Sequence, residues 1–157
     1  MARAYIGLGT NLGDREGNLA RAARLLAEAG DIRLLKKSSL EETVPVDYAG
    51  QPDFLNQVVL AETELAPREL LDALQKIEYA MGRVRTVPKG PRVIDLDLLL
   101  YDALVYRDDA LTLPHPGIVK RPFVMREMLE LDGELSDPVT GKKYREVLRH
   151  AENREHQ

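Results

Sequence analysis

Two aspartates, Asp95 and Asp97, interrupt the most apolar run of the chain, GPRVIDLDLLLYD at residues 90–102. Side chains at i and i+2 of a strand point to the same face, so the two carboxylates share one face with β-carbons roughly 7 Å apart. The residues expected to pack on the opposite face are Ile94, Leu96, Leu98 and Leu100. A desolvated anion without a partner costs several kcal/mol, so the acidic face must either be wet or meet a cation.

Magnesium is a cation that suits such a pair. Mg²⁺ keeps several waters and is typically held by one or two carboxylates together with substrate phosphates. Two acids on a rigid strand could also bridge two cations about 3.5–4 Å apart, as in phosphoryl-transfer sites. The plain alternative is an exposed antiparallel face on which acids are harmless, and this stretch alone leaves both interpretations open.

Basic side chains flank the acidic pair on both sides in sequence. They are Arg83, Arg85, Lys89 and Arg92 before the strand, and His115, Lys120 and Arg121 after it. Guanidinium forks bind phosphate oxygens and a metal neutralises others, so this combination suits a metal-bound polyphosphate. A solvated, charged loop is the usual fate of such a run and remains the alternative.

Composition limits the classes of protein to be considered. The 157 residues, 44% hydrophobic and 31% charged, predict one folded domain over 1–157. A net charge of −4 gives no general attraction to nucleic acid, and the absence of cysteine excludes disulfides, zinc thiolates and a cysteine nucleophile. No apolar run approaches the roughly 18–20 residues of a membrane span, and the first ten residues lack a signal-peptide core. We therefore expect a cytoplasmic protein, and a monomer, because no feature indicates a partner surface.

The elements that must position these residues follow one order along the chain. Apolar runs predict strands at 4–9, 32–39, 54–63 and 93–101. Helical periodicity predicts two helices, one that ends near Gly30 and one that begins at Pro67. This β-α-β-β-α-β order predicts an α+β, ferredoxin-like sandwich with two helices on one face of an antiparallel sheet. A hairpin within 102–114, a helix near 122–131 and a turn-rich tail should follow. The long loops at 41–53 and 83–91 are candidates to carry function.

Familiar nucleotide motifs are absent. In GLGTNLG (7–13), the third glycine of a dinucleotide fingerprint would fall at position 12, which is Leu12. The chain has neither a P-loop nor a G-x-S-x-G elbow. We interpret Gly7 and Gly9 as positions of close packing, and residues 11–14 as a mobile loop that ends in a helix cap.

Five segments together resemble the 6-hydroxymethyl-7,8-dihydropterin pyrophosphokinase family over about residues 4–131. They are AYIGLGTNLGD, QPDFLNQVV, GRVR, GPRVIDLDLLLYD and LTLPHPGIVKRPFV. The resemblance implies a ferredoxin-like fold and a step of folate biosynthesis. In that step ATP, as co-substrate, donates its β,γ-pyrophosphoryl group to the hydroxymethyl group of the reduced pterin and AMP is released.

The resemblance also implies roles for individual residues. The catalytic positions are Arg83, Arg92, Asp95 and Asp97, and the two aspartates would hold two Mg²⁺ ions. The nucleotide-binding positions are Gln75, Glu78, Arg85, Leu98, Leu111, Thr112, His115 and Arg121. The pterin-binding positions are Thr43, Val44, Val46, Phe54, Asn56 and Phe123. The chain departs from the common family pattern at Glu41, Lys89, Ala110 and Pro116.

Physical reasoning supports the pterin slot separately. A flat heteroaromatic ring gains from stacking between aromatic rings, and the chain's only two phenylalanines, Phe54 and Phe123, both fall in these motifs. Asn56 shares a strand face with Phe54. The ordinary alternatives are a core role for Phe54, helix packing for Phe123, a structural role for His115 and a helix-surface role for Gln75 and Glu78.

Two other functions could use the same β-α-β-β-α-β order. A nucleotidyl transferase or cyclase would also hold metals on strand aspartates, but it would attack the α-phosphorus of ATP and release pyrophosphate. An RNA-binding module would need aromatic residues on its central strands, where the third strand offers only Phe54 at its start. The product of ATP cleavage separates the two enzymes, and the negative net charge counts against the RNA-binding module.

Overall fold

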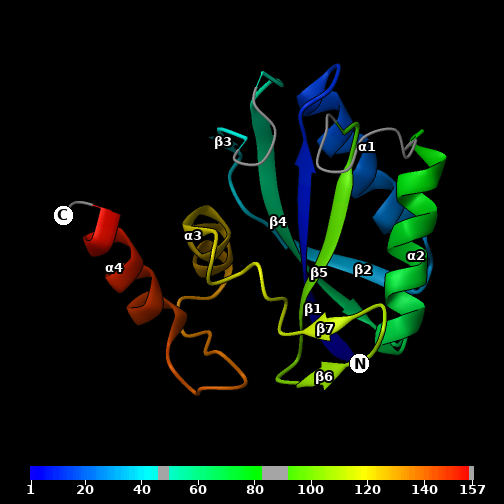
Figure 1. The fold of residues 1–157 in the computed structure, drawn as a ribbon. Coiled ribbons are helices and arrows are strands. Elements are labelled where there is room, and N and C mark those ends of the chain that lie inside the picture. The colour runs from blue at the N-terminus through cyan, green and yellow to red at the C-terminus, as the bar shows by residue number, and fades with distance from the viewer. Residues whose placement is uncertain (46–49, 83–91, 156–157) are drawn as a thin grey trace.

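The computed structural model describes residues 1–45, 50–82 and 92–155, the side chain of Glu155 excepted, and its main sheet is antiparallel. The long strands are β1 (Ala2–Thr10), β2 (Ile32–Lys37), β4 (Phe54–Thr63) and β5 (Asp95–Tyr101), in the order β2-β4-β1-β5, and a short β3 (Glu41–Thr43) pairs with β4. Figure 1 shows β1 between β4 and β5, so the centre of the sheet is the N-terminal strand. The predicted α+β, ferredoxin-like arrangement is confirmed.

Helices α1 (Arg15–Glu28) and α2 (Pro67–Ala80) cover one face of this sheet (Figure 1). Helix α1 begins after Asp14, whose carboxylate accepts the Gly17 N–H at 3.1 Å, as the predicted cap requires. Helix α2 begins at Pro67, and Gly82 follows it with φ +89°, a left-handed conformation that favours glycine. The apolar stripes of both helices pack on the sheet through Leu19, Ala22, Leu26, Leu70, Leu74 and Ile77.

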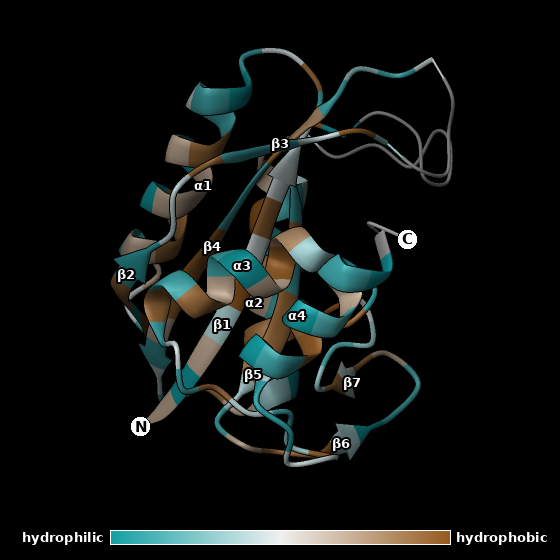
Figure 2. Ribbon diagram, turned by 90° about the vertical axis from the view of Figure 1, so that its left-hand side faces the viewer, coloured by the Kyte–Doolittle hydropathy of each residue, from teal (hydrophilic) through white to brown (hydrophobic). Residues whose placement is uncertain are grey.

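Helices α3 (Pro122–Leu131) and α4 (Tyr144–Glu155) lie on the opposite face, in front of the strands in Figure 2. Their buried residues form a second apolar cluster, which includes Val124, Met125, Met128, Leu131, Tyr144 and Leu148. The sheet contributes Tyr5, Val58, Leu60, Leu99 and Leu100 to that cluster. The sheet is therefore covered on both faces, but α3 and α4 cover only part of theirs, because a cavity occupies the remainder.

The predicted alternation along β5 fails at one residue. Leu96 and Leu98 pack under α1 and α2 as expected, but Leu100 belongs to the cluster under α3 and α4. The register between β1 and β5 shifts between Tyr5 and Ile6, which pair with Leu100 and Leu98, so Leu99 is an extra residue on β5. Because a bulge of this kind reverses the faces of the residues beyond it, the expectation for Leu100 was wrong.

Two further elements lie where the sequence predicts none. Strand β3 falls inside the predicted long loop, and α4 falls inside the predicted turn-rich tail. Both are stabilised by tertiary contacts, since β3 is an edge strand on β4 and α4 buries Tyr144 and Leu148 against α3. The predicted hairpin is confirmed as β6 (Tyr106–Arg107) and β7 (Thr112–Leu113). Among the described helices, none has the length and apolar character that crossing a membrane would need.

Candidate active site

A cavity of about 340 Å³ opens over one end of the sheet, on the same face as α3 and α4. Its floor is β1, which contributes Gly7 and Gly9 there. A β-carbon on Gly9 would lie 3.1 Å from Asn56 Oδ1, and one on Gly7 would lie 3.4 Å from Leu99 Cδ1. The interpretation of Gly7 and Gly9 as positions of close packing is therefore confirmed, and their lack of side chains helps to leave room for a ligand.

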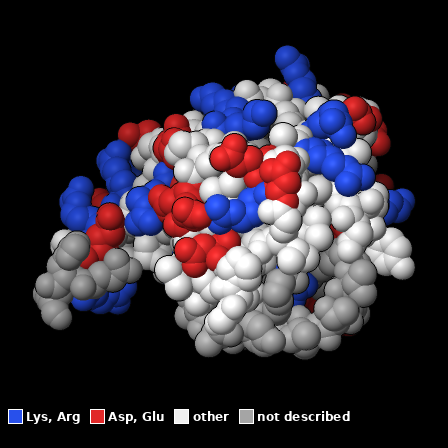
Figure 3. All heavy atoms as spheres, turned by 90° about the horizontal axis from the view of Figure 1, so that it is seen from above, with Lys and Arg blue, Asp and Glu red and all other residues white. Residues whose placement is uncertain are grey.

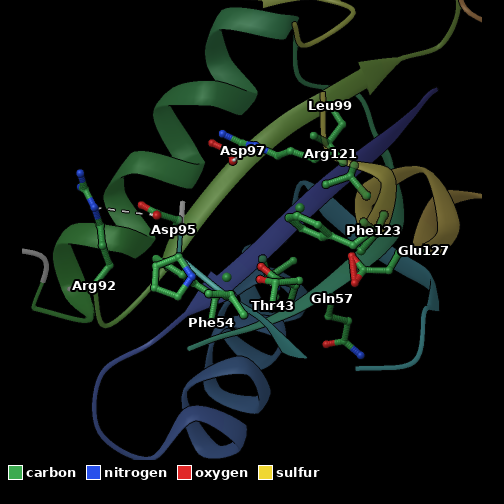
Figure 4. Close-up of a pocket in the computed structure, with 18 of the residues that line it drawn as sticks. Thr43, Phe54, Gln57, Arg92, Asp95, Asp97, Leu99, Arg121, Phe123 and Glu127 are labelled. Atoms are coloured by element: carbon green, nitrogen blue, oxygen red, sulfur yellow. Dashed lines mark hydrogen bonds and ion pairs between the residues drawn. The ribbon is translucent and has the colours of Figure 1, made fainter. Parts of the chain in front are cut away.

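Both phenylalanines line this first cavity, Phe54 from the start of β4 and Phe123 from the first turn of α3 (Figure 4). Asn56 lies on the same face of β4 as Phe54, as the two-residue period predicts. Its Nδ2 donates to Thr43 Oγ1 at 2.7 Å and to the Glu41 carbonyl oxygen at 3.2 Å. Since both amide hydrogens are used, the atom that Asn56 can offer a ligand is its acceptor, Oδ1.

The two aspartates form another wall of the first cavity, and each has an arginine beside it. Arg92 Nε lies 3.9 Å from Asp95 Oδ2, and Arg121 Nη1 lies 3.7 Å from Asp97 Oδ2. The side chains of Asp95 and Asp97 remain 30% and 42% exposed. The pairs are loose and the carboxylates stay partly exposed, so the acidic face is both partly open to solvent and next to cationic side chains.

A second cavity, of about 250 Å³, lies on the other side of Asp97. Four of the residues predicted to bind the nucleotide line it, namely Leu98, Leu111, Thr112 and His115. Two departures from the family pattern, Ala110 and Pro116, line it as well. Asp97 lines both cavities, so one carboxylate stands where the contents of the two cavities would meet.

His115 is held in a single tautomer beside Asp97. Its Nδ1 accepts the Gly117 N–H at 2.8 Å, so the proton of the neutral ring is on Nε2, which is left as the donor. Burial lowers the pKa of His115, Asp97 opposes that effect, and Arg121 adds to it. The pKa of His115 therefore lies below its ordinary value, and the neutral ring offers Nε2–H as a hydrogen-bond donor.

Asn11 joins three segments around the first cavity, a role that the sequence analysis missed. It is buried, its backbone N–H donates to the Arg92 carbonyl at 3.0 Å, and its Oδ1 accepts the Arg92 N–H at 2.7 Å. Its Nδ2 donates to Gln51 Oε1 and to the Pro52 carbonyl. The interpretation of residues 11–14 as a mobile loop is therefore wrong for Asn11, which positions the backbone from which Arg92 projects.

Helix α2 contributes to the site less directly than expected. Gln75 is exposed, and neither Gln75 nor Glu78 lines a cavity in the described part of the chain. The helix-surface alternative is wrong for Glu78, because Glu78 is 6% exposed and its Oε2 accepts the Leu96 N–H at 2.8 Å. That bond satisfies a backbone donor between Asp95 and Asp97, so Glu78 positions the acidic pair from behind. Three predicted residues, Arg83, Arg85 and Val46, lie outside the described residues.

Glu127 lines the first cavity, and the sequence analysis also missed it. It follows Phe123 by four residues on α3, so the two side chains share a helix face. Glu127 is 1% exposed, and its Oε2 has no hydrogen-bond partner in the structure. Burial, then the neighbouring Glu41 and Glu130, raise the pKa of the carboxyl to about 8, against a smaller opposing effect of Arg126.

Glu41 ties β3 to α3, the helix that carries Phe123 and Glu127. Arg126 Nε and Nη2 donate to the two carboxylate oxygens of Glu41 at 3.1 and 2.8 Å, which joins α3 to β3 through a two-pronged pair. Arg126 also lies 3.9 Å from Glu152 on α4. Glu41 is a departure from the family pattern, and in this chain it fixes the position of the helix that carries Phe123.

Among the residues that the structure describes, the charges around the cavity end are of both signs. Figure 3 looks down on this end, and on its coloured surface lysines and arginines alternate with aspartates and glutamates. An RNA-binding surface would gather basic side chains. The coloured part of this face therefore gives no support to the RNA-binding alternative.

The donors present fit magnesium. Asp95 and Asp97 supply hard carboxylate oxygens, and among the described residues there is no cluster of three or more histidine, cysteine, aspartate or glutamate side chains that could hold an ion alone. Mg²⁺ prefers such an incomplete set, because it retains waters and takes further oxygens from phosphates. Zinc or calcium sites would need more protein ligands.

Comparisons with known proteins show the family to which the chain belongs. The family model of 7,8-dihydro-6-hydroxymethylpterin-pyrophosphokinase (HPPK) matches residues 5–133. A 2-amino-4-hydroxy-6-hydroxymethyldihydropteridine pyrophosphokinase of Bacillus subtilis is 42% identical over 137 residues, 87% of this chain and 82% of that protein. The folic acid synthesis protein fol1 of Schizosaccharomyces pombe is 44% identical over 145 residues. That match covers 92% of this chain, which spans only 20% of the length of that relative.

The fold has relatives of known structure. A Plasmodium falciparum HPPK-DHPS, crystallised with pterin and p-hydroxybenzoate, superposes with a TM-score of 0.76 at 16% identity. The superposition covers 98% of this chain and 43% of the other. At this identity the likeness establishes the fold alone.

Proposed function

The chain belongs to the 7,8-dihydro-6-hydroxymethylpterin-pyrophosphokinase family, as a pyrophosphokinase of folate synthesis, and we propose that it transfers pyrophosphate from ATP to 6-hydroxymethyl-7,8-dihydropterin. The observation that carries the proposal is the position of Asp97 between two cavities. The first cavity has aromatic walls that suit a flat ring, and the second is lined by residues predicted to bind the nucleotide. A carboxylate shared by both cavities suits a reaction between their contents.

The reaction is a direct displacement at phosphorus. The pterin hydroxyl oxygen attacks the β-phosphorus, the new O–P bond forms, the bond between Pβ and its bridging oxygen to Pα breaks, and AMP leaves with that oxygen. The hydroxyl proton passes to solvent. Catalysis then consists of positioning and stabilisation of charge, with no protein nucleophile.

Asp95 and Asp97 would hold two Mg²⁺ ions, whose charge would neutralise phosphate oxygens and favour ionisation of the hydroxyl. Arg92 and Arg121, now beside these acids, would exchange them for phosphate oxygens when ATP binds. Phe54 and Phe123 would hold the pterin ring, with Asn56 at its polar edge and Thr43 and Val44 at the rim. His115 Nε2, Leu98, Leu111 and Thr112 would contact the nucleotide in the second cavity.

The remaining proposals concern the whole chain. Residues 1–157 would form a single pyrophosphokinase domain that acts as a monomer in the cytoplasm, without nucleic acid or membrane partners. The predicted nucleotide site also includes Arg83, Arg85, Gln75 and Glu78, and the predicted pterin site also includes Val46. In the ligand-free structure Glu78 acts through the β5 backbone.

The test is the identity of the product. With Mg²⁺, ATP and the reduced hydroxymethylpterin, we expect AMP to appear in step with pterin diphosphate, and neither without the pterin. Release of free pyrophosphate with a nucleotidyl product would instead support the transferase or cyclase.

Asn variants at the acidic pair test the metal assignment. Asp97→Asn or Asp95→Asn should lower the rate of AMP release at least a hundredfold while the protein stays folded, because a charged ligand is lost without a change in shape. The matched control is Asp31→Asn, at an exposed position away from both cavities. Near-native AMP release by either variant would disprove the metal assignment but leave the reaction intact.

A further inference from the structure

Glu127 is a buried carboxyl whose Oε2 has no hydrogen-bond partner among the residues that the structure describes. It lines the first cavity on the side of Phe123 away from Asp95 and Asp97 (Figure 4). It is 1% exposed, Oε2 has no hydrogen-bond partner, and the neighbouring wall residue on α3, Val124, is apolar. A buried polar atom without a partner is costly, and a ligand in the cavity can remove that cost.

The chemistry of the ligand determines what reaches this end of the cavity. If the hydroxymethyl group faces Asp95 and Asp97, the opposite, aminopyrimidine edge of the ring faces away from them. That edge carries a ring N–H beside an exocyclic amino group, a pair of donors arranged as in a guanidinium fork. Asn56 offers this edge a single acceptor, Oδ1, because its amide hydrogens are donated to Thr43 and Glu41, so a pair of donors needs a further acceptor.

We propose that the Glu127 carboxyl accepts hydrogen bonds from the aminopyrimidine edge of the bound pterin and selects rings that carry the 2-amino group. This inference rests on the proposed function and adds to it a residue that determines specificity. Two parallel N–H···O bonds would complete the acceptor that the ligand-free structure leaves without a partner.

The electrostatic surroundings of Glu127 support this role. Glu41 from β3 and Glu130 from α3 repel a charge on Glu127, while Arg126 on α3, which is itself paired with Glu41 and with Glu152 of α4, attracts it more weakly. Asn56 of β4 is neutral, and Asp97 and Arg121 lie along the same cavity. The carboxyl therefore keeps its proton near pH 7 without ligand, and two N–H donors would favour its release on binding.

The experiment compares two ligands and two variants by titration calorimetry. The ligands are 6-hydroxymethylpterin and 6-hydroxymethyllumazine, in which oxygen replaces the 2-amino group, each with Mg²⁺ and a non-hydrolysable ATP analogue present. The unaltered protein should prefer the pterin by about a hundredfold or more, because the lumazine leaves the acceptor unsatisfied. Glu127→Gln should weaken pterin binding by roughly tenfold to a hundredfold and reduce the preference to less than about tenfold.

Glu146→Gln, an exposed change on α4 outside both cavities, is the matched control and should leave the preference intact. A second readout needs no variant. The pterin affinity of the unaltered protein should rise as the pH increases from about 6 to 8, and the buffer should take up protons on binding, because Glu127 ionises when the ligand binds. An unchanged preference in folded Glu127→Gln, or an affinity independent of pH, would overturn the inference alone. Absence of pterin binding by the unaltered protein would overturn the proposed function together with the inference.

Discussion

Glu127 should make the ligand-free protein less stable as the pH rises. Its pKa is about 8 in the folded protein, against an ordinary value of 4.5, so the folded state binds the proton more tightly than the unfolded state. The contribution of Glu127 to stability is therefore greatest at a pH below its pKa in the unfolded state. It falls as the pH rises between the unfolded and folded pKa values, and it is constant above the folded pKa. The usual carboxylate, whose pKa is lowered by folding, has the opposite sign.

The magnitude follows from the size of the shift. Each pH unit between the two pKa values changes the free energy of unfolding by about 1.4 kcal/mol. Between about pH 5.5 and pH 7.5, this one carboxyl should therefore remove roughly 2.7 kcal/mol, and over the whole interval about 5 kcal/mol. For a domain whose total stability is typically about 5–15 kcal/mol, that loss is easily measured.

Urea unfolding at a series of pH values measures the effect, followed by far-ultraviolet circular dichroism because the chain has no tryptophan. Glu127→Gln removes the titrating group and keeps the shape of the side chain, so its advantage over the unaltered protein should grow by about 1.4 kcal/mol per pH unit. Glu146→Gln controls for the loss of one negative charge and should follow the unaltered protein. Parallel curves for the unaltered protein and Glu127→Gln would refute the reasoning, because Glu127 would then be ionised throughout.

Two other substitutions test the architecture of the site. Gly9→Ala places a β-carbon 3.1 Å from Asn56 Oδ1, and Asn56 is held in place by two hydrogen bonds. In calorimetry, pterin affinity should therefore fall about tenfold while ATP affinity is unchanged. An unchanged pterin affinity would contradict this expectation. Glu78→Ala leaves the Leu96 N–H without its acceptor, so the free energy of unfolding in urea should drop by about 1–3 kcal/mol. The control Gln75→Ala, at an exposed position of the same helix, should change it by less than about 0.5 kcal/mol. Equal losses in the two variants would contradict the role of Glu78.

The periodicity of apolar residues and the residues that begin or end helices and strands were sufficient to predict most of the elements. The bounds of β4 match the prediction, α2 begins at Pro67, and Asp14 caps α1. The same period of two correctly brought Phe54 and Asn56 to one cavity and Asp95 and Asp97 to one wall. These are consequences of backbone geometry within one element, which a sequence carries directly.

What escaped prediction depends on contacts between elements. Leu100 changes face because of a bulge that exists only in the pairing of β1 with β5, and β3 and α4 are short segments stabilised by their neighbours. The burial of Glu78 and Glu127 is equally invisible along the chain, since glutamates on helices are normally exposed. One usable signal was present for Glu127, because it follows Phe123 by one helical turn and so must share its direction.

The bulge at Leu99 also explains how a charged face and a dry core coexist on one side of a single sheet. Before the bulge, β5 turns Asp95 and Asp97 toward the cavity; beyond it, Leu99 and Leu100 both enter the apolar cluster under α3 and α4. The gain in buried apolar area at that end contributes to stability, while the acids at the other end remain half-buried beside Arg92 and Arg121. Glu127 lies on the boundary between these two environments, buried like a core residue but lining the cavity. A ligand that contacts Glu127 must therefore supply the hydrogen-bond donors. Because the ligand-free protein lacks those donors, its stability at neutral pH should be lower.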